Sequence, residues 1–167
     1  DLLYGKKPDD GNYYFTGWTV DDEDIELKNP DSSWTTFTMP ARDVTLTCNF
    51  TKGQKYGLYV DGVQVMTENA KDILGNGVFT FNENTKTLYI NDDYSTENST
   101  LISCNYSFND TLTITPKKDV TLSAKTHLIR FGGIDGIITG ENKLTLKSGY
   151  GIYLEDSDFR IINANVE

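Results

Sequence analysis

The side chains that could carry out chemistry in this chain are few and widely separated. The single histidine, His127, is accompanied by no nucleophile motif, so nothing beyond composition supports a Ser-His-Asp arrangement. A glycosidase needs a pair of carboxylates about 5–10 Å apart. The acids that could supply it are Asp135, Glu155, Asp156 and Asp158. Each lies in turn sequence near Gly or Ser, where acids are common for conformational reasons alone. We therefore expect no catalytic residue.

Metal and cofactor sites are not indicated either. The two cysteines, Cys48 and Cys104, lie in strand-like sequence and lack the paired spacing of a zinc site. We expect two buried apolar side chains, and a disulfide between them is the alternative. The acidic stretch 21–24 contains no glycine of the kind that a calcium loop places among its acids. We predict no metal ligand and no cofactor.

Tyrosines are the better candidates for binding, because proteins commonly hold sugars with aromatic faces and a few polar groups. Four of the ten tyrosines fall in loops or at strand positions expected to face solvent. These are Tyr94, Tyr106, Tyr150 and Tyr153. Packing at the corners of the fold explains the same pattern, since scattered exposed aromatic residues need no function. We predict these four as the ligand-binding residues.

The net charge restricts the class of partner. The chain carries 25 acidic and 15 basic residues, a formal charge of −10. An acidic surface repels phosphate backbones and anionic lipid headgroups, which argues against nucleic acids and membrane surfaces as partners. No run of 18 apolar residues occurs, so we expect no membrane insertion.

The elements that would position these side chains are short strands in residues 111–162. Seven apolar runs begin at 112, 120, 128, 137, 144, 152 and 159, with turn formers between them. This even spacing predicts a parallel β-solenoid with three faces per coil and about 24 residues per turn. The apolar columns would be Leu112 with Ile137 and Phe159, Val120 with Leu144, and Leu128 with Ile152. An antiparallel β-sandwich is the alternative, since it also places turns roughly every 8–12 residues.

Residues 1–52 are expected to form a separate small β module. Phe15-Thr16-Gly17-Trp18 is strand-like, and residues 36–46, Thr-Phe-Thr-Met-Pro-Ala-Arg-Asp-Val-Thr-Leu, lead to Asn49-Phe50. This combination resembles the InlB B-repeat-like modules of bacterial surface proteins, which pair an F-x-G-W strand with a T-F-x-M-P-x-x-D-V-T hairpin. The resemblance implies a β-grasp-like extracellular module whose first strand would precede Asp1. It also implies that Trp18, Phe37 and Met39 are core and hairpin residues.

Residues 53–167 are expected to form a capped solenoid. Asp61-Gly62 between two alternating runs predicts a hairpin, and a second hairpin is expected at 78–90. Residues 67–74 predict a short helix. The opening Tyr56-Gly57-Leu58-Tyr59-Val60-Asp61-Gly62-Val63-Gln64-Val65 resembles segments that lead into β-solenoid regions of secreted Firmicutes proteins, regions labelled carbohydrate-binding domains. The hairpins would cover the open edge of the first coil.

The sequence as a whole predicts an all-β, non-catalytic module of a secreted or cell-wall-attached protein. It would serve in adhesion or glycan binding, or as a spacer scaffold, with glycans or a host or cell-wall surface as partner. A fragment of a carbohydrate-active β-helix enzyme, a lyase or a glycosidase, is the alternative. Because the chain begins without Met and ends directly after a strand, we expect it to be part of a longer protein, truncated at its C-terminal end.

Overall fold

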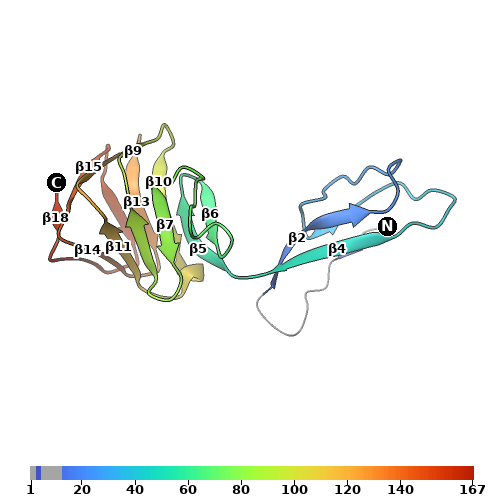
Figure 1. Cartoon of the computed structure of the whole chain (residues 1–167), viewed down its shortest axis with the longest axis horizontal. Helices are drawn as coiled ribbons and strands as arrows, with labels where there is room; N and C mark the ends of the chain where they lie inside the picture. Colours follow the sequence, from blue (N-terminus) through green and yellow to red (C-terminus); the bar gives the residue numbers. More distant parts are fainter. Residues whose placement is uncertain (1–2, 5–12) are drawn as a thin grey trace. The chain divides into compact units, whose positions relative to one another are not determined.

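The chain forms two units built almost entirely of strands. The computed structural model describes residues 3–4 and 13–167, and 50% of the chain is in strands against 2% in helix. Contacts within the chain separate Asp1–Gln54 from Lys55–Glu167 (Figure 1). The all-β prediction is confirmed, and each unit is described by itself below.

The first unit contains two small antiparallel sheets. One pairs β2 (Tyr13–Val20) with β4 (Leu46–Lys52), and a bulge interrupts the register between Phe15 and Gly17. The other pairs β1 (Leu3–Tyr4) with β3 (Trp34–Thr35). Both pairings are between strands that lie far apart in sequence, so the sheets form only when the whole unit closes.

A small aromatic cluster forms the centre of the first unit. Trp18 is buried, and its indole Nε1 donates a hydrogen bond to the carbonyl of Ser32 at 3.0 Å. The Phe15 ring lies 5.8 Å from Trp18 and 5.9 Å from Phe50, in tilted and edge-on geometries that aromatic pairs prefer. Trp18 is therefore the core residue that the family resemblance implied.

The hairpin expected from residues 36–46 is wrong. After β3 the chain runs without strand pairing until Leu46, Phe37 is only half-buried, and Met39 is 64% exposed. Side chains from the preceding acidic stretch hold this segment instead. The backbone N–H of Thr45 donates to Asp21 Oδ1 at 2.8 Å and its carbonyl accepts from Asp21 N–H at 3.1 Å, so both backbone groups of Thr45 are satisfied without a partner strand.

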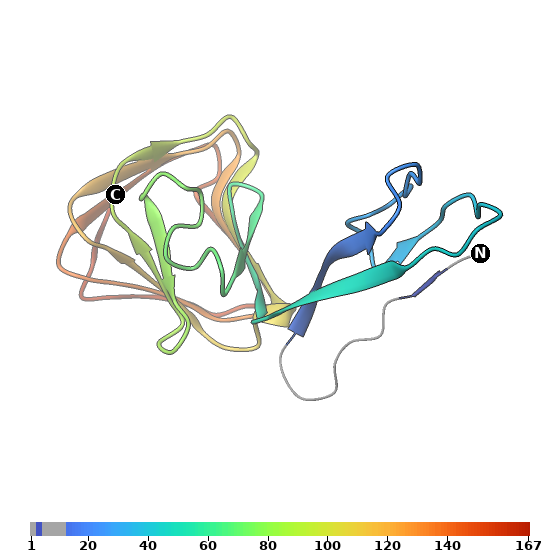
Figure 2. The same cartoon turned by 45° about the vertical axis from the view of Figure 1, so that its right-hand side comes forward.

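The second unit is a parallel β-solenoid of about three turns. Figure 2 shows its coils surrounding a common interior. One face consists of β10 (Thr100–Asn105), β13 (His127–Gly132) and β16 (Ile152–Glu155). The second consists of β8 (Thr87–Ile90), β11 (Leu112–Pro116), β14 (Gly136–Thr139) and β17 (Phe159–Ile162). The third consists of β9 (Tyr94–Ser95), β12 (Val120–Ser123), β15 (Lys143–Lys147) and β18 (Asn165–Val166). The pairing within each face is parallel, which confirms the solenoid over the sandwich.

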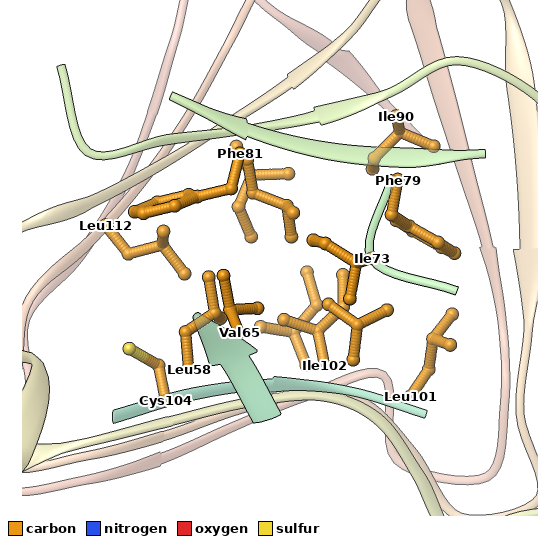
Figure 3. Packing of buried hydrophobic residues seen from close by; sticks show 14 of the residues in the cluster. Leu58, Val65, Ile73, Phe79, Phe81, Ile90, Leu101, Ile102, Cys104 and Leu112 are labelled. Carbon is orange, nitrogen blue, oxygen red and sulfur yellow. The ribbon is translucent and has the colours of Figure 1, made fainter. Parts of the chain in front are cut away.

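Antiparallel strands cover the first coil. The hairpin of β5 (Lys55–Val60) and β6 (Val63–Met66) pairs with β10, and β7 (Phe79–Asn82) pairs with β8. Their apolar side chains close the end of the interior, where Val65, Ile73 and Phe79 face the same cluster (Figure 3). The edge that the first coil would expose is thereby paired.

The short helix expected at residues 67–74 is absent. These residues form successive turns that are hydrogen-bonded to β7: Phe81 N–H donates to the carbonyl of Ala70 at 2.6 Å, and Ile73 N–H donates to the carbonyl of Phe79 at 3.0 Å. Ala70 and Ile73 are both buried. Tertiary contacts thus decide the backbone here, which a local capping pattern cannot anticipate.

The apolar columns match the prediction on one face and are shifted by one residue on two. Val120 and Leu144 are opposite each other and buried, as expected. Leu112 lies opposite Gly136, however, while Ile137 points outward opposite Thr113. Gly136 fits because the ring of Phe131 occupies the space that a side chain there would need. On the face of β13, Ile129 rather than Leu128 lies opposite Ile152.

The two cysteines are free thiols in different units, so the disulfide alternative is wrong. Cys104 is buried in the solenoid interior, and burial raises the pKa of its thiol. Cys48 lies half-buried on β4, and burial raises its thiol pKa as well. Cys104 thus behaves as the small apolar core residue that the sequence predicted.

Candidate functional site

The structure separates the four predicted tyrosines. Tyr94 is half-buried on β9, with its hydroxyl donating to Asp61 Oδ2 at 2.7 Å and its ring edge-on to Phe79 at 5.2 Å. The other three lie on or beside the sheet ordered β16-β13-β10-β5-β6. Tyr106, Tyr150 and Tyr153 are exposed, at 78%, 74% and 42% respectively.

A surface hollow of about 650 Å³ lies over this sheet, on its outer side. Its lining comes from β5, β10, β13, the end of β16 and the 3-10 turn η1 (Tyr106–Phe108). The residues are Tyr59, Ser103, Cys104, Asn105, Tyr106, Arg130, Gly132, Gly133, Glu155 and Asp156. Tyr106 is thus the one predicted tyrosine that lines the hollow directly.

Strand register places the polar lining in rows. Tyr59, Ser103, Arg130 and Tyr153 are successive partners across β5, β10, β13 and β16. Because side chains alternate along a strand, these four project to the outer face while their neighbours fill the interior. A second row, two residues further along the strands, contains Asn105, Gly132 and Glu155. The glycine in this row leaves the space between its neighbours open.

Arg130 links the hollow to Tyr153. Its Nη2 lies 3.2 Å from Glu155 Oε2, and its guanidinium lies 5.6 Å from the centroid of the Tyr153 ring. Both members of the ion pair are about half exposed. Such a pair contributes about 0–1 kcal/mol in water, so a ligand can rearrange it at little cost. Tyr153 therefore borders the hollow.

Tyr106 is held in place by the backbone turn that carries it. Asn105 Oδ1 accepts from Ser107 N–H at 3.0 Å, and Asn109 N–H donates to the carbonyl of Tyr106 at 3.3 Å. Phe108 anchors the turn in the core. Gly57 on β5 permits the close approach, because a Cβ there would lie 2.5 Å from Phe108 N. The exposed ring is therefore presented on a fixed support.

Tyr150 lies outside the lining of the hollow. Its ring stacks on His127 with the centroids 5.4 Å apart and an interplanar angle of 25°, and the His127 ring meets Tyr153 edge-on at 5.4 Å. His127 is thus packed against tyrosines on the outer face of the sheet. No cluster of three or more metal-ligating side chains occurs among the residues that the structure describes.

The four carboxylates considered for catalysis are divided between two places. Glu155 and Asp156 line the hollow. Asp135 Oδ1 instead accepts from the backbone N–H of Asp158 at 3.0 Å, one coil further on, and holds a corner of the solenoid. Asp135 therefore has the structural role that turn sequence suggested.

Sequence reasoning missed several residues of the hollow, above all Tyr59, Asn105 and Arg130. The alternation in Leu58-Tyr59-Val60 and in Ile129-Arg130-Phe131 carried the signal that their side chains point outward. The alternation does not show how the strands of successive coils align with one another. Only the register shows that Tyr59 and Arg130 flank the same serine.

Comparison with known proteins finds a similarity within the first unit. Residues 7–54 match the divergent InlB B-repeat domain. This domain is commonly found in bacterial surface proteins. The match includes no residue of the solenoid, for which the carbohydrate-binding resemblance stays a prediction. No curated protein and no solved structure matches the chain.

In the InlB B-repeat-like unit, the acidic stretch 21–24 anchors the chain that returns to β4. Arg42 Nε lies 2.6 Å from Asp22 Oδ2, and its Nη2 lies 3.1 Å from Asp24 Oδ2. The hydrogen bond from Arg42 lowers the pKa of Asp22 and raises that of Arg42. Asp22 and Asp24 therefore have a structural partner in Arg42.

Among residues 3–4 and 13–167, no helix has the length and apolarity needed to span a bilayer.

Proposed function

We propose that the solenoid unit is a non-catalytic carbohydrate-binding module of an extracellular bacterial protein, secreted or attached to the cell wall. The hollow over β5, β10, β13 and β16 is its binding site. The observation that carries the proposal is the meeting of the exposed Tyr106 ring with Asn105, Arg130 and Glu155 around one open volume. The surface-protein occurrence of the InlB B-repeat domain supports the extracellular location.

The chemistry of the lining suits a sugar. A pyranose has an apolar face of C–H groups, which fits against an aromatic ring, and a rim of hydroxyls that both donate and accept hydrogen bonds. Arg130 offers donors, Glu155 offers acceptors, and Asn105 offers both. The support is a sheet on which the groups are fixed by strand register, so little order has to be created on binding.

Binding is favoured over hydrolysis by the placement of the acids. Glu155 and Asp156 are neighbours in sequence at the end of one strand, so they approach a ligand from the same side. A glycosidase places its two carboxylates on either side of the bond that is cleaved. A carbohydrate-active enzyme is therefore the second candidate, and a spacer without a ligand is the third.

The test is a glycan array probed with the whole chain, followed by calorimetry on the sugars that bind. We expect saturable binding, and we expect Tyr106→Ala to weaken it. One face of a tyrosine ring, about a third of the area that an aromatic side chain buries, is about 60 Å². At about 25 cal/mol per Å² this is about 1.5 kcal/mol, or about tenfold in Kd.

Tyr150→Ala is the matched control, because Tyr150 is as exposed as Tyr106 but stacks on His127 outside the lining. It should leave Kd unchanged. An equal loss in both variants would refute the assignment to the hollow. A flat array would favour the spacer, and shortening of a bound oligosaccharide on incubation would favour the enzyme.

A further inference from the structure

Three lining residues of the hollow, together with Tyr153 at its border, define a direction for its ligand. The row of Tyr59, Ser103, Arg130 and Tyr153 crosses four strands, each one strand spacing from the next. At about 4.8 Å per strand, the backbone positions of the first and last residue are about 14 Å apart. The row follows the stacking direction of the coils, so a ligand that contacts both ends must be extended and must lie across the strands.

The charges of the hollow also restrict the ligand. Its cation, Arg130, is already paired with Glu155, and Asp156 adds a second acid to the lining. The lining therefore holds one more acid than base, in a chain whose formal charge is −10. A carboxylated or sulfated sugar would have to displace Glu155 from Arg130 and approach Asp156, at a cost in repulsion.

We propose that the ligand is an extended oligosaccharide without acidic groups, lying along the stacking direction of the coils. This inference rests on the proposed function of the hollow. Hydroxyl groups of the sugar bridge the Arg130–Glu155 pair, donating to the carboxylate and accepting from the guanidinium without separating them. Tyr59 and Tyr106 contact the apolar faces of the sugar rings, and Tyr153 borders the far end of the row.

Calorimetry on the whole chain with three series of oligosaccharides, from disaccharide to hexasaccharide, tests the inference. The series are a neutral gluco-oligosaccharide, an oligogalacturonate and a deacetylated amino-sugar oligomer. For the neutral series we expect Kd to fall with length and then reach a plateau once the row is filled. We expect the acidic series to bind about tenfold more weakly than the neutral one at low salt, with the difference shrinking as salt is added.

Removal of the Glu155 charge gives the sharper readout, because it should abolish the preference for neutral over acidic sugars. Glu155→Gln keeps the shape of the side chain and one of its acceptor oxygens, but removes the charge that pairs with Arg130 and so frees Arg130 for an acidic sugar. We expect this variant to bind the oligogalacturonate about tenfold more tightly than the unmodified chain and the neutral series within about twofold.

Glu167→Gln is the matched control. Glu167 also accepts an ion pair, from Lys143 Nζ at 2.6 Å, but in the β15–β18 region of the third face. Glu167→Gln removes one negative charge, as Glu155→Gln does, but at a place outside the hollow. It should leave the affinity for the oligogalacturonate unchanged. Equal gains in the two variants would show an effect of net charge alone and overturn the placement.

The outcomes separate this inference from the proposed function. Tighter binding of acidic oligomers than of neutral ones, or neutral binding that does not depend on length, would overturn the inference and leave a carbohydrate module in place. No saturable binding in any of the three series, together with a flat array, would overturn the proposed function itself.

Discussion

Removal of the Asp61 carboxylate should loosen the cap from the first coil of the solenoid. Asp61 lies in the turn between β5 and β6, and its oxygens accept from Tyr94 Oη at 2.7 Å, Thr96 Oγ1 at 2.6 Å and Asn98 Nδ2 at 2.7 Å. The three donors lie on and after β9, in the first coil. One side chain therefore ties the cap hairpin to a strand of another face.

The magnitude follows from the bonds and the backbone. Hydrogen bonds to charged acceptors contribute about 1.5–3 kcal/mol when buried, and about 1 kcal/mol each is reasonable for the half-buried Asp61. Asp61 also has a left-handed backbone, with φ at 49°, where Ala costs about 1 kcal/mol more than Asp or Asn. Asp61→Ala should therefore cost about 4 kcal/mol, and Asp61→Asn about 1–2 kcal/mol, because Asn keeps the shape and the backbone preference.

Chemical and thermal denaturation followed by circular dichroism measure these losses. For a unit of this size, about 4 kcal/mol corresponds to a fall in Tm of roughly 15 °C. Asp156→Ala is the control for the backbone contribution, because Asp156 has φ at 50° without a comparable set of hydrogen bonds among the described residues. If Asp61→Ala and Asp156→Ala lower Tm equally, the hydrogen bonds to Asp61 contribute nothing and the reasoning fails.

The same carboxylate predicts a pH dependence. Burial raises the pKa of Asp61, but the hydrogen bonds from Thr96, Tyr94 and Asn98 outweigh burial, so its pKa lies below the usual 3.8. The ionised group therefore stabilises the fold above the pKa of the unfolded chain, and this stabilisation is lost as the pH falls through the folded pKa. Asp61→Asn should reduce the loss of stability between about pH 5 and pH 2. An unchanged acid profile would count against the network.

Three further changes test other parts of the fold. Burial and Asp61 raise the pKa of Tyr94 to about 12, so the neutral hydroxyl stabilises the fold, and this contribution is lost as the pH rises from about 10 to 12. Tyr94→Phe should therefore reduce the loss of stability in this alkaline range, measured by denaturant titration at each pH. Gly57→Ala should cost about 1–3 kcal/mol and weaken glycan binding, because a Cβ there meets the η1 backbone, while Gly132→Ala, with open space around it, should be neutral in Tm. A Cβ in Gly136→Ala would overlap the buried Phe131 ring, so this change should lower stability by a similar amount. Adding Phe131→Leu to the same chain should restore part of that stability, as measured by calorimetric unfolding.

The positions of the seven strands β11 to β17 were predictable because the solenoid repeats one short unit. Each face takes about eight residues, and turn formers fall between the apolar runs with little variation. The phase of each strand was less predictable. In Ile137-Ile138 and Leu128-Ile129 both residues are apolar, so alternation alone does not say which one faces inward. The Phe131 ring under Gly136 decides the first case, and sequence distance hides that contact.

The candidate site was predictable in kind but not in composition. Exposed tyrosines were expected, and three of the four are exposed on one sheet. Tyr94 follows the same local pattern, yet its strand lies opposite the buried Leu122 and its hydroxyl is committed to Asp61. Which aromatic rings share a surface depends on the pairing of coils, a property of residues about 25 positions apart that a single sequence does not display.

The hollow and the core are made by the same strands, and this links binding to folding. In Ile129-Arg130-Phe131 the first and third side chains fill the interior of the solenoid. The middle one, Arg130, supplies the cation of the hollow. A slip of one residue in β13 would bury Arg130 without a partner and remove it from Glu155 at once. The interior therefore enforces the register that the site needs. Asn105 on β10 also has both a structural and a site role. It caps η1, its side chain lies close to Gly57, and it lines the hollow. The turn that stabilises the end of the strand therefore also presents Tyr106 to a ligand.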